Sequence, residues 1–122
     1  MKKDFWLNAR VAVLGGGSWG TVLANLVARN CQGVTLWMRS EEIARSLNAT
    51  RKNDAYLPDL TLDPRVRAVS ELSRVFEERV QCLIWALPSS ATRGIAQEFA
   101  SHMRGDEILL HATKGVEAGT LK

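Results

Sequence analysis

The sequence has few cysteines, no long apolar run and no block of basic residues, and each shortage excludes a class of protein. The longest uninterrupted apolar runs, Val11–Leu14 and Cys82–Leu87, are far shorter than the roughly 18–20 residues that a membrane span needs. Asp4, Asn8 and Arg10 interrupt the amino end, so it has no apolar region of the kind found in secretory signals. We therefore expect a chain that crosses no membrane and stays in the cytoplasm.

The scarcity of cysteine and the scatter of basic residues exclude two further classes. Cys31 and Cys82 form no C-x-x-C pair, and no histidine accompanies them at metal-ligand spacing. We therefore expect reduced structural thiols and no metal site. The 16 Lys and Arg residues outnumber 13 Asp and Glu residues, but they lie among acids and are not interleaved with aromatics. This distribution argues against nucleic-acid binding.

What is present is the composition of one ordinary globular domain. The chain has 122 residues, of which 46% are apolar and 24% charged. These proportions are typical of a folded domain, so we assign residues 1–122 to a single domain. That length is short for an enzyme that closes a cleft between two domains, and we expect a further substrate domain to be missing.

Short β-like runs alternate along the chain with segments whose apolar residues recur at helical spacing. This alternation is typical of βαβ units on a parallel sheet. In the first predicted helix, which ends near Asn30, the apolar positions 19, 22, 23, 26 and 27 share one face. The sequence predicts an α/β, Rossmann-like, doubly wound parallel sheet of order 3-2-1-4-5. Its strands are predicted at Arg10–Leu14, Val34–Trp37, Val66–Val69, Cys82–Ala86 and Ile108–Ala112.

Serine residues mark the predicted starts of the later helices, because a serine hydroxyl accepts a hydrogen bond from an early helical N–H. The stretch Asp54–Pro64 contains two prolines and predicts an irregular connection, longer than is usual between elements. The candidate N-caps are Ser40, Ser70 and either Ser89 or Ser90, and the predicted inward residues are Ile43, Leu47, Leu72, Val75, Phe76, Ile95 and Phe99.

The pattern Gly15-x-Gly17-x-x-Gly20 directly follows a predicted strand and opens a predicted helix, which is the context of a dinucleotide-binding turn. Gly15 permits the tight turn, Gly17 lets the backbone approach a pyrophosphate, and Gly20 lets the helix lie close to the sheet. Backbone N–H groups near Ser18 and Trp19, with the positive end of the helix dipole, would hold the phosphates. A glycine-rich turn without a ligand is the alternative.

The residue after the second predicted strand bears on the choice of nicotinamide cofactor. NAD-selective sites place an acidic residue there, about 20 positions on, where it binds the ribose hydroxyls. Arg39 occupies this position and favours pairing with the 2′-phosphate of NADP. Glu41 and Glu42 are close enough to take the acidic role, and Arg39 can also be a solvated surface charge. The expected cofactor is therefore NADP or NAD.

Two further candidates follow the fourth and fifth predicted strands. Pro88 and Ser89 come after one strand, and Lys114 and Gly115 after the other. Ligands of open α/β sheets bind at the carboxyl ends of the strands, so we expect Pro88 and Lys114 to line the same crevice as the glycine turn. A single ammonium group there suits a phosphate or a carbonyl oxygen, and an exposed loop lysine is the alternative.

Five short segments carry a resemblance to a known family. They are Gly15-Gly-Gly-Ser-Trp-Gly-Thr21, Trp37-Met-Arg39, the Asn53–Pro58 stretch that ends Tyr-Leu-Pro, Leu87-Pro-Ser89 and Lys114-Gly115. In this order they resemble the amino-terminal portion of the bacterial-type NAD(P)-dependent glycerol-3-phosphate dehydrogenases, along the whole chain. The glycine motif is shared with many dehydrogenases, whereas the Ser-Trp-Gly-Thr continuation, the Tyr-Leu-Pro loop and the Lys-Gly pair are more specific.

The resemblance implies a reversible hydride transfer between NAD(P)H and dihydroxyacetone phosphate, which gives sn-glycerol 3-phosphate for phospholipid synthesis. It implies that Ser18, Trp19 and Arg39 contact the cofactor, with Tyr56 as a further contact, and that Lys114 lies where nucleotide and substrate meet. The family places its principal catalytic lysine in a helical carboxyl-terminal domain. We therefore expect this chain, as a fragment of such an enzyme, to bind cofactor without catalysis.

Two other functions are consistent with the same residues. Another NAD(P)-dependent reductase of a hydroxyacid or phosphate substrate, or a non-catalytic dinucleotide-sensing module, would use the same glycine turn. The predicted last strand, Ile108–Ala112, is apolar and carries no proline or charge. Its open edge predicts that the chain dimerises or aggregates through that strand.

Overall fold

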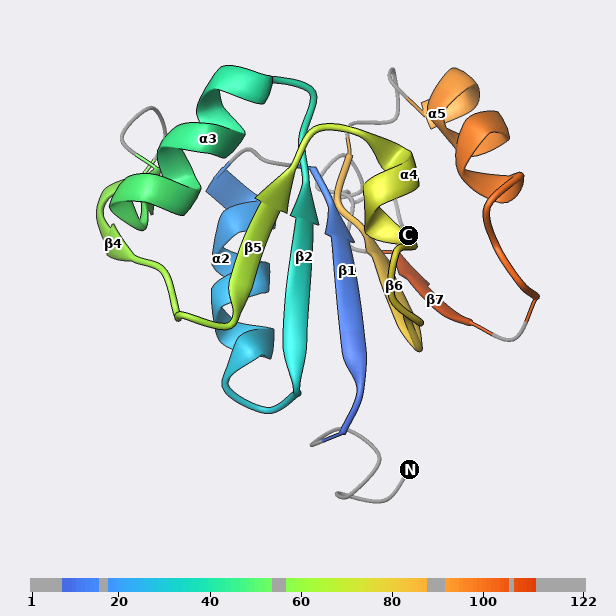
Figure 1. Cartoon of the computed structure of the whole chain (residues 1–122), viewed down its shortest axis with the longest axis horizontal. Helices are drawn as coiled ribbons and strands as arrows, with labels where there is room; N and C mark the ends of the chain where they lie inside the picture. The colour runs from blue at the N-terminus through green and yellow to red at the C-terminus, as the bar shows by residue number, and fades with distance from the viewer. Residues whose placement is uncertain (1–7, 16–17, 54–56, 88–91, 106, 112–122) are drawn as a thin grey trace, which may run out of the picture.

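The computed structural model describes residues 8–15, 18–53, 57–87, 92–105 and 107–111, and these form a parallel sheet with helices on both faces (Figure 1). The sheet order is β5-β2-β1-β6-β7, which is 3-2-1-4-5 in sequence order, so the predicted doubly wound topology is confirmed. All four strand pairs are parallel. The strands are β1 (Arg10–Leu14), β2 (Gly33–Trp37), β5 (Val66–Val69), β6 (Cys82–Trp85) and β7 (Ile108–His111), and the helices are α2 (Ser18–Ala28), α3 (Glu41–Thr50), α4 (Leu72–Val75) and α5 (Thr92–Ala100).

Two hydrophobic cores lie on opposite faces of the sheet, because successive residues of each strand point to opposite sides. In Figure 1, α2 lies behind the strands and α4 in front of them. The core on the α2 face includes Val11, Val13, Leu36 and Ile84 of the sheet with Ala24, Ala28 and Leu47 of the helices. The core on the α4 face includes Leu14, Trp37, Leu83 and Trp85 with Leu72, Val75 and Phe99.

The predicted apolar face of α2 is right in part. Leu23 and Val27 of that face pack against the core. Trp19 and Leu26, which belong to the same predicted face, are 45% and 51% exposed. Leu26 lies toward β6 and β7, where it lines an apolar groove with Ile84 and Leu110. The buried residues of this helix are small or polar and are Gly20, Thr21, Ala24, Asn25 and Ala28.

The predicted helix starts have mixed outcomes. Ser40 is the N-cap of α3, and its hydroxyl accepts a hydrogen bond from the Ile43 N–H at 3.1 Å. Ser70 is not the N-cap of α4, because the chain stays extended for one more residue and Glu71 takes that position without a side-chain capping bond. Ser89 and Ser90 lie outside the described residues.

The stretch predicted to be irregular contains regular structure. Strand β3 (Lys52–Asn53) pairs with β4 (Leu57–Thr61) in a two-stranded antiparallel ladder. Arg51 ends α3 in the left-handed region, with φ 64°, and so turns the chain into this ladder. Pro58 is tolerated because a two-stranded ladder consists only of edge strands, where a missing N–H breaks no central pairing.

The β5 edge of the sheet is closed by side chains from α3. The Asn48 amide donates to the Ala68 carbonyl oxygen at 2.9 Å and accepts from the Ala68 N–H at 2.9 Å. The Arg51 guanidinium donates to the Val66 carbonyl oxygen at 2.6 Å. These groups occupy hydrogen-bonding positions that a further strand would use, so they protect this edge from strand addition.

Both cysteines are buried and free, as predicted. Burial raises the pKa of the Cys82 thiol to about 11, and the Cys31 thiol nearby adds to the rise. Burial also raises the pKa of Cys31, whose thiol donates a hydrogen bond to the Gly33 carbonyl oxygen. The neutral thiol is therefore the form that the folded protein favours at both positions.

Raised thiol pKa values make the folded state less stable in alkali. For Cys82 the stabilisation is fully present below the ordinary pKa of 9.0 and is lost as the pH rises toward about 11. We expect the free energy of unfolding to fall by about 2–3 kcal/mol across that interval. Urea titrations under reducing conditions from pH 8 to pH 11 measure it. The Cys82→Ala variant should lose most of this slope, and an identical slope in the variant would assign the effect to other groups.

Candidate functional site

The turn between β1 and α2 lies at the carboxyl edge of the sheet and joins three strand ends. Gly15 has φ +128°, a conformation that residues with a side chain rarely adopt. Its N–H donates to the Trp37 carbonyl oxygen at the end of β2, at 2.8 Å. A Cβ on Gly15 would lie 2.7 Å from the Ala86 carbonyl oxygen, just beyond β6. No residue other than glycine fits this position without moving the backbone.

Gly20 brings the first turn of α2 directly against this turn. A Cβ on Gly20 would overlap the Gly15 carbonyl oxygen. The first turn of α2 therefore lies closer to the Gly15 backbone than any side chain at position 20 would allow. Gly15 and Gly20 together set the position of the amino end of α2 at this edge.

The amino end of α2 presents its backbone N–H groups at the same edge. The helix begins at Ser18 and has no acidic residue in its first turn. Its first N–H groups have no acceptor within the helix, and the helix dipole adds positive potential there. An anionic group that approaches the turn meets backbone donors and no opposing carboxylate from that first turn, so this end of α2 suits a phosphate.

The loop after β2 adds the charged groups. Arg39 is exposed and lies two residues beyond the end of β2. Glu41 is paired with Arg45 at 2.7 Å along the outside of α3. This exposed pair holds the Glu41 carboxylate beside Arg45 along the helix. Glu42 is exposed in the same first turn.

Trp37 contributes a buried polar atom that sequence reasoning missed. The residue is 5% exposed and closes β2. Its indole Nε1 is buried and has no hydrogen-bond partner among the described residues. The glycine cradle and this unsatisfied donor both fit a nucleotide bound at the edge. A local sequence pattern gives no signal for such a donor, because it depends on burial by distant residues.

The structure places part of the predicted site together. Gly15, Trp19, Gly20 and Arg39 all lie at the carboxyl edge of the sheet, and α2 begins there with Ser18. The remaining predicted site residues, Gly17, Tyr56, Pro88 and Lys114, lie outside the described residues.

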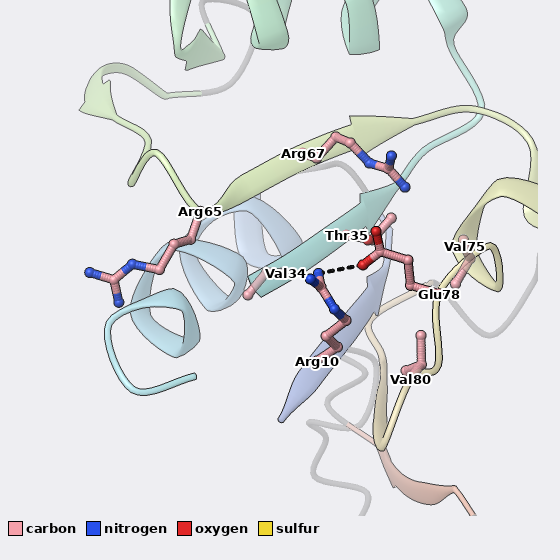
Figure 2. Close-up of a pocket in the computed structure, with 8 residues that line it drawn as sticks. All are labelled: Arg10, Val34, Thr35, Arg65, Arg67, Val75, Glu78 and Val80. Atoms are coloured by element: carbon pink, nitrogen blue, oxygen red, sulfur yellow. Dashed lines mark ion pairs between the residues drawn. The ribbon is translucent and has the colours of Figure 1, made fainter. Parts of the chain in front are cut away.

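A polar pocket of about 140 Å³ lies near Arg10, the first residue of β1, away from the glycine turn (Figure 2). Arg10 pairs there with Glu78 at 2.7 Å, and Arg67 lies 3.6 Å from the Glu77 carboxylate. Figure 2 shows Arg65 pointing away from Arg10 and Arg67. Because these cations are already paired or directed outward, the pocket has no converging positive charge for an anion.

Among the described residues, no group of three or more His, Cys, Asp or Glu side chains could hold a metal ion. None of the helices described is long and apolar enough to span a bilayer.

Comparisons with known proteins identify the family of this chain. Residues 10–122 match the family described as NAD-dependent glycerol-3-phosphate dehydrogenase N-terminus. A glycerol-3-phosphate dehydrogenase (NAD(P)+) of Enterococcus faecalis is 38% identical over 95% of this chain and 34% of its own length. That of Pseudomonas aeruginosa is 43% identical over 92% of this chain and 32% of its own length. The chain therefore spans about a third of the length of the curated relatives it matches.

A solved structure supports the same relationship. The crystal structure of glycerol-3-phosphate dehydrogenase from Coxiella burnetii has a TM-score of 0.81 to this chain at 28% identity. The similarity covers 93% of this chain and 35% of that one. The Saccharomyces cerevisiae enzyme has a TM-score of 0.80 at 24% identity, which shows the shared fold.

The close approach at Gly20 predicts that this position accepts no side chain. Gly20→Ala should lower the free energy of unfolding by at least about 2 kcal/mol, because its Cβ would overlap the Gly15 carbonyl. Gly94→Ala is the matched control: that helical glycine has open space around its Cβ position, so alanine should be neutral or stabilise by up to about 1 kcal/mol. Equal stability of the two variants in urea unfolding would contradict the close contact.

Proposed function

Since this chain belongs to the NAD-dependent glycerol-3-phosphate dehydrogenase N-terminal family, we propose that residues 1–122 form the dinucleotide-binding domain of such an enzyme. The enzyme would reversibly reduce dihydroxyacetone phosphate to sn-glycerol 3-phosphate, the precursor of phospholipids. The observation that carries the proposal is the turn between β1 and α2, where Gly15 and Gly20 leave no room for a Cβ at the edge where open α/β sheets bind ligands.

The backbone of the glycine turn holds the pyrophosphate in this proposal. N–H groups near Ser18 and Trp19 donate to phosphate oxygens, and the dipole of α2 favours the negative charge. Gly15 and Gly20 let the backbone and the helix approach closely enough. The bound NAD(P)H supplies the hydride, and this domain positions it.

Arg39 accounts for acceptance of NADP. A guanidinium at the end of β2 pairs with a 2′-phosphate through charge-assisted hydrogen bonds, which are stronger than neutral ones. The Glu41–Arg45 pair supports this assignment, because it holds one competing carboxylate along α3. NAD, which has only ribose hydroxyls there, would bind without that pairing.

The residues that follow the fourth and fifth sheet strands serve the other half of the dinucleotide in this proposal. Pro88 contacts the cofactor, and Lys114 contacts the substrate where the nicotinamide ring ends. Tyr56, which precedes the third strand of the sheet, is a further cofactor contact. Ketone reduction also needs a proton donor and a cationic pocket for the developing alkoxide, held within about 3–3.5 Å of the reacting atoms. One lysine cannot serve both roles, so we assign the principal catalytic lysine to the helical carboxyl-terminal domain that the family resemblance implies.

We place the protein in the cytoplasm, acting on a small phosphorylated substrate without nucleic acid. The two free buried thiols support a reducing compartment.

Calorimetry with NADPH and NADH tests the proposal on this chain. NADPH should bind, and Gly17→Val should abolish binding of both cofactors, because a side chain there would block approach to the pyrophosphate. Arg39→Ala should weaken NADPH by about 1–3 kcal/mol and leave NADH nearly unchanged. Arg29→Ala, an exposed arginine just beyond the other end of α2, is the charge-matched control. If Arg39→Ala weakens the binding of NADPH and NADH equally, Arg39 does not pair with the 2′-phosphate.

We also propose that this chain associates through β7. Among the described strands β7 has one neighbour, β6, and Leu109 and Leu110 are 46% and 45% exposed on its two faces. An apolar strand with an open edge is a template for pairing with a second copy.

Light scattering over a range of concentrations tests this association, and the parent chain should form dimers or larger species. Leu109→Lys places a charge on β7 and should shift the chain toward monomer. Leu26→Lys changes an equally exposed leucine on α2 and should leave edge pairing intact. If the unsubstituted chain is monomeric at high concentration, the proposal is overturned. If Leu26→Lys gives a monomer and Leu109→Lys does not, the chain associates through α2 and not through β7.

A further inference from the structure

Trp37 buries a hydrogen-bond donor that the described chain leaves without an acceptor. Its indole packs on the α4 face of the sheet, in the apolar cluster that contains Leu14, Val69 and Leu72. Its Nε1 atom is buried and unpartnered among the described residues. An unpaired buried N–H is costly, by about 1–3 kcal/mol, so a partner from outside the chain would stabilise it.

The position of Trp37 identifies where that partner comes from. Leu14, Trp37 and Val69 are register partners at the ends of three adjacent strands. The Trp37 carbonyl oxygen accepts from the Gly15 N–H at 2.8 Å, so the residue is bonded directly to the glycine turn. In the proposed function, Gly15 starts the pyrophosphate site and Arg39 receives the 2′-phosphate. The adenosine ribose carries both of those phosphates, so the adenosine half must lie over the end of β2, at Trp37.

The surroundings of the indole narrow the chemical class of the acceptor. Leu72 and Leu87 belong to the same cluster and are buried, so a phosphate oxygen brought among these side chains would lose its hydration without compensation. An adenine ring is flat, uncharged and carries ring nitrogens that accept hydrogen bonds. It can therefore enter an apolar setting and satisfy the donor at the same time.

We propose that Trp37 Nε1–H donates a hydrogen bond to a ring nitrogen of adenine in the bound dinucleotide, and so helps to select an adenine nucleotide. This inference rests on the proposed function. Because Nε1 is covered, the indole must turn toward the edge when the nucleotide binds.

Indole N–H resonances of ¹⁵N-labelled protein report the bond directly. The chain has four tryptophans, and Trp37→Phe assigns the resonance of interest by its loss. We expect NADPH and adenosine 2′,5′-bisphosphate to move the Trp37 resonance downfield and to slow its exchange with water. Nicotinamide mononucleotide, which has no adenine, should leave it in place.

Affinity gives the second readout. Trp37→Phe keeps an aromatic ring but removes the donor, and it should weaken NADPH roughly three- to tenfold, the effect of one net hydrogen bond. Trp85→Phe is the matched control, because Trp85 closes β6, is equally buried at 5% and packs in the same cluster. That variant should bind NADPH within twofold of the parent.

The outcomes separate this inference from the proposed function. If calorimetry shows NADPH binding to the parent chain while the Trp37 resonance stays unmoved, the hydrogen bond is absent and the inference is overturned. An equal loss of affinity in both tryptophan variants also overturns it, because packing would then explain the effect. If NADPH does not bind the parent chain at all, the proposed function fails first.

Discussion

The contact between α2 and the turn at Gly15 is the constraint on which the rest of the structure depends. Gly15 is bonded to the end of β2 and packed against the chain just after β6, while Gly20 lies where any Cβ would overlap the Gly15 carbonyl. One turn therefore fixes the relative positions of three strand ends and one helix end. The same geometry brings backbone donors to the edge of the sheet. Both the fold and the proposed ligand binding therefore require that Gly15 and Gly20 have no Cβ.

The sequence pattern was sufficient for the sheet and only partly sufficient for α2. Each strand of the sheet is a short apolar run between helical segments, and this local signal was enough for the strand order. For α2, helical periodicity predicted that Trp19, Val22, Leu23, Leu26 and Val27 face the core. Leu23 and Val27 do pack against the core, but Trp19 and Leu26 are exposed. Which part of an apolar helix face is covered depends on the strands and helices beside it, and periodicity does not contain that information.

The features that could not be predicted share a dependence on residues far apart in the chain. Asn48 closes the β5 edge through both backbone groups of Ala68, twenty positions later, and nothing near Asn48 in sequence indicates that role. The unsatisfied Nε1 of Trp37 arises from burial by residues of other strands and of α4. In the candidate site, the glycine turn and Arg39 were predictable because their signals lie within one βαβ unit. Trp37 was predicted as the end of a strand and belongs to a segment that carries the family resemblance, but its buried, unpartnered donor was not predicted.

The topology leaves an asymmetry between the two halves of the sheet. Right-handed crossovers place α2 and α3 over one face as the chain passes from β1 to β2 and β5, and they place α4 and α5 over the other as it passes to β6 and β7. The α2 face of β6 and β7 therefore receives no crossover helix from the described elements. An apolar groove of about 360 Å³ lies there, lined by residues that include Leu26, Ile84 and Leu110. The exposure of Leu26 and Leu110 thus follows from the direction of the chain and the handedness of its crossovers. Substitution of either leucine alone would leave this face of β6 and β7 without a covering helix.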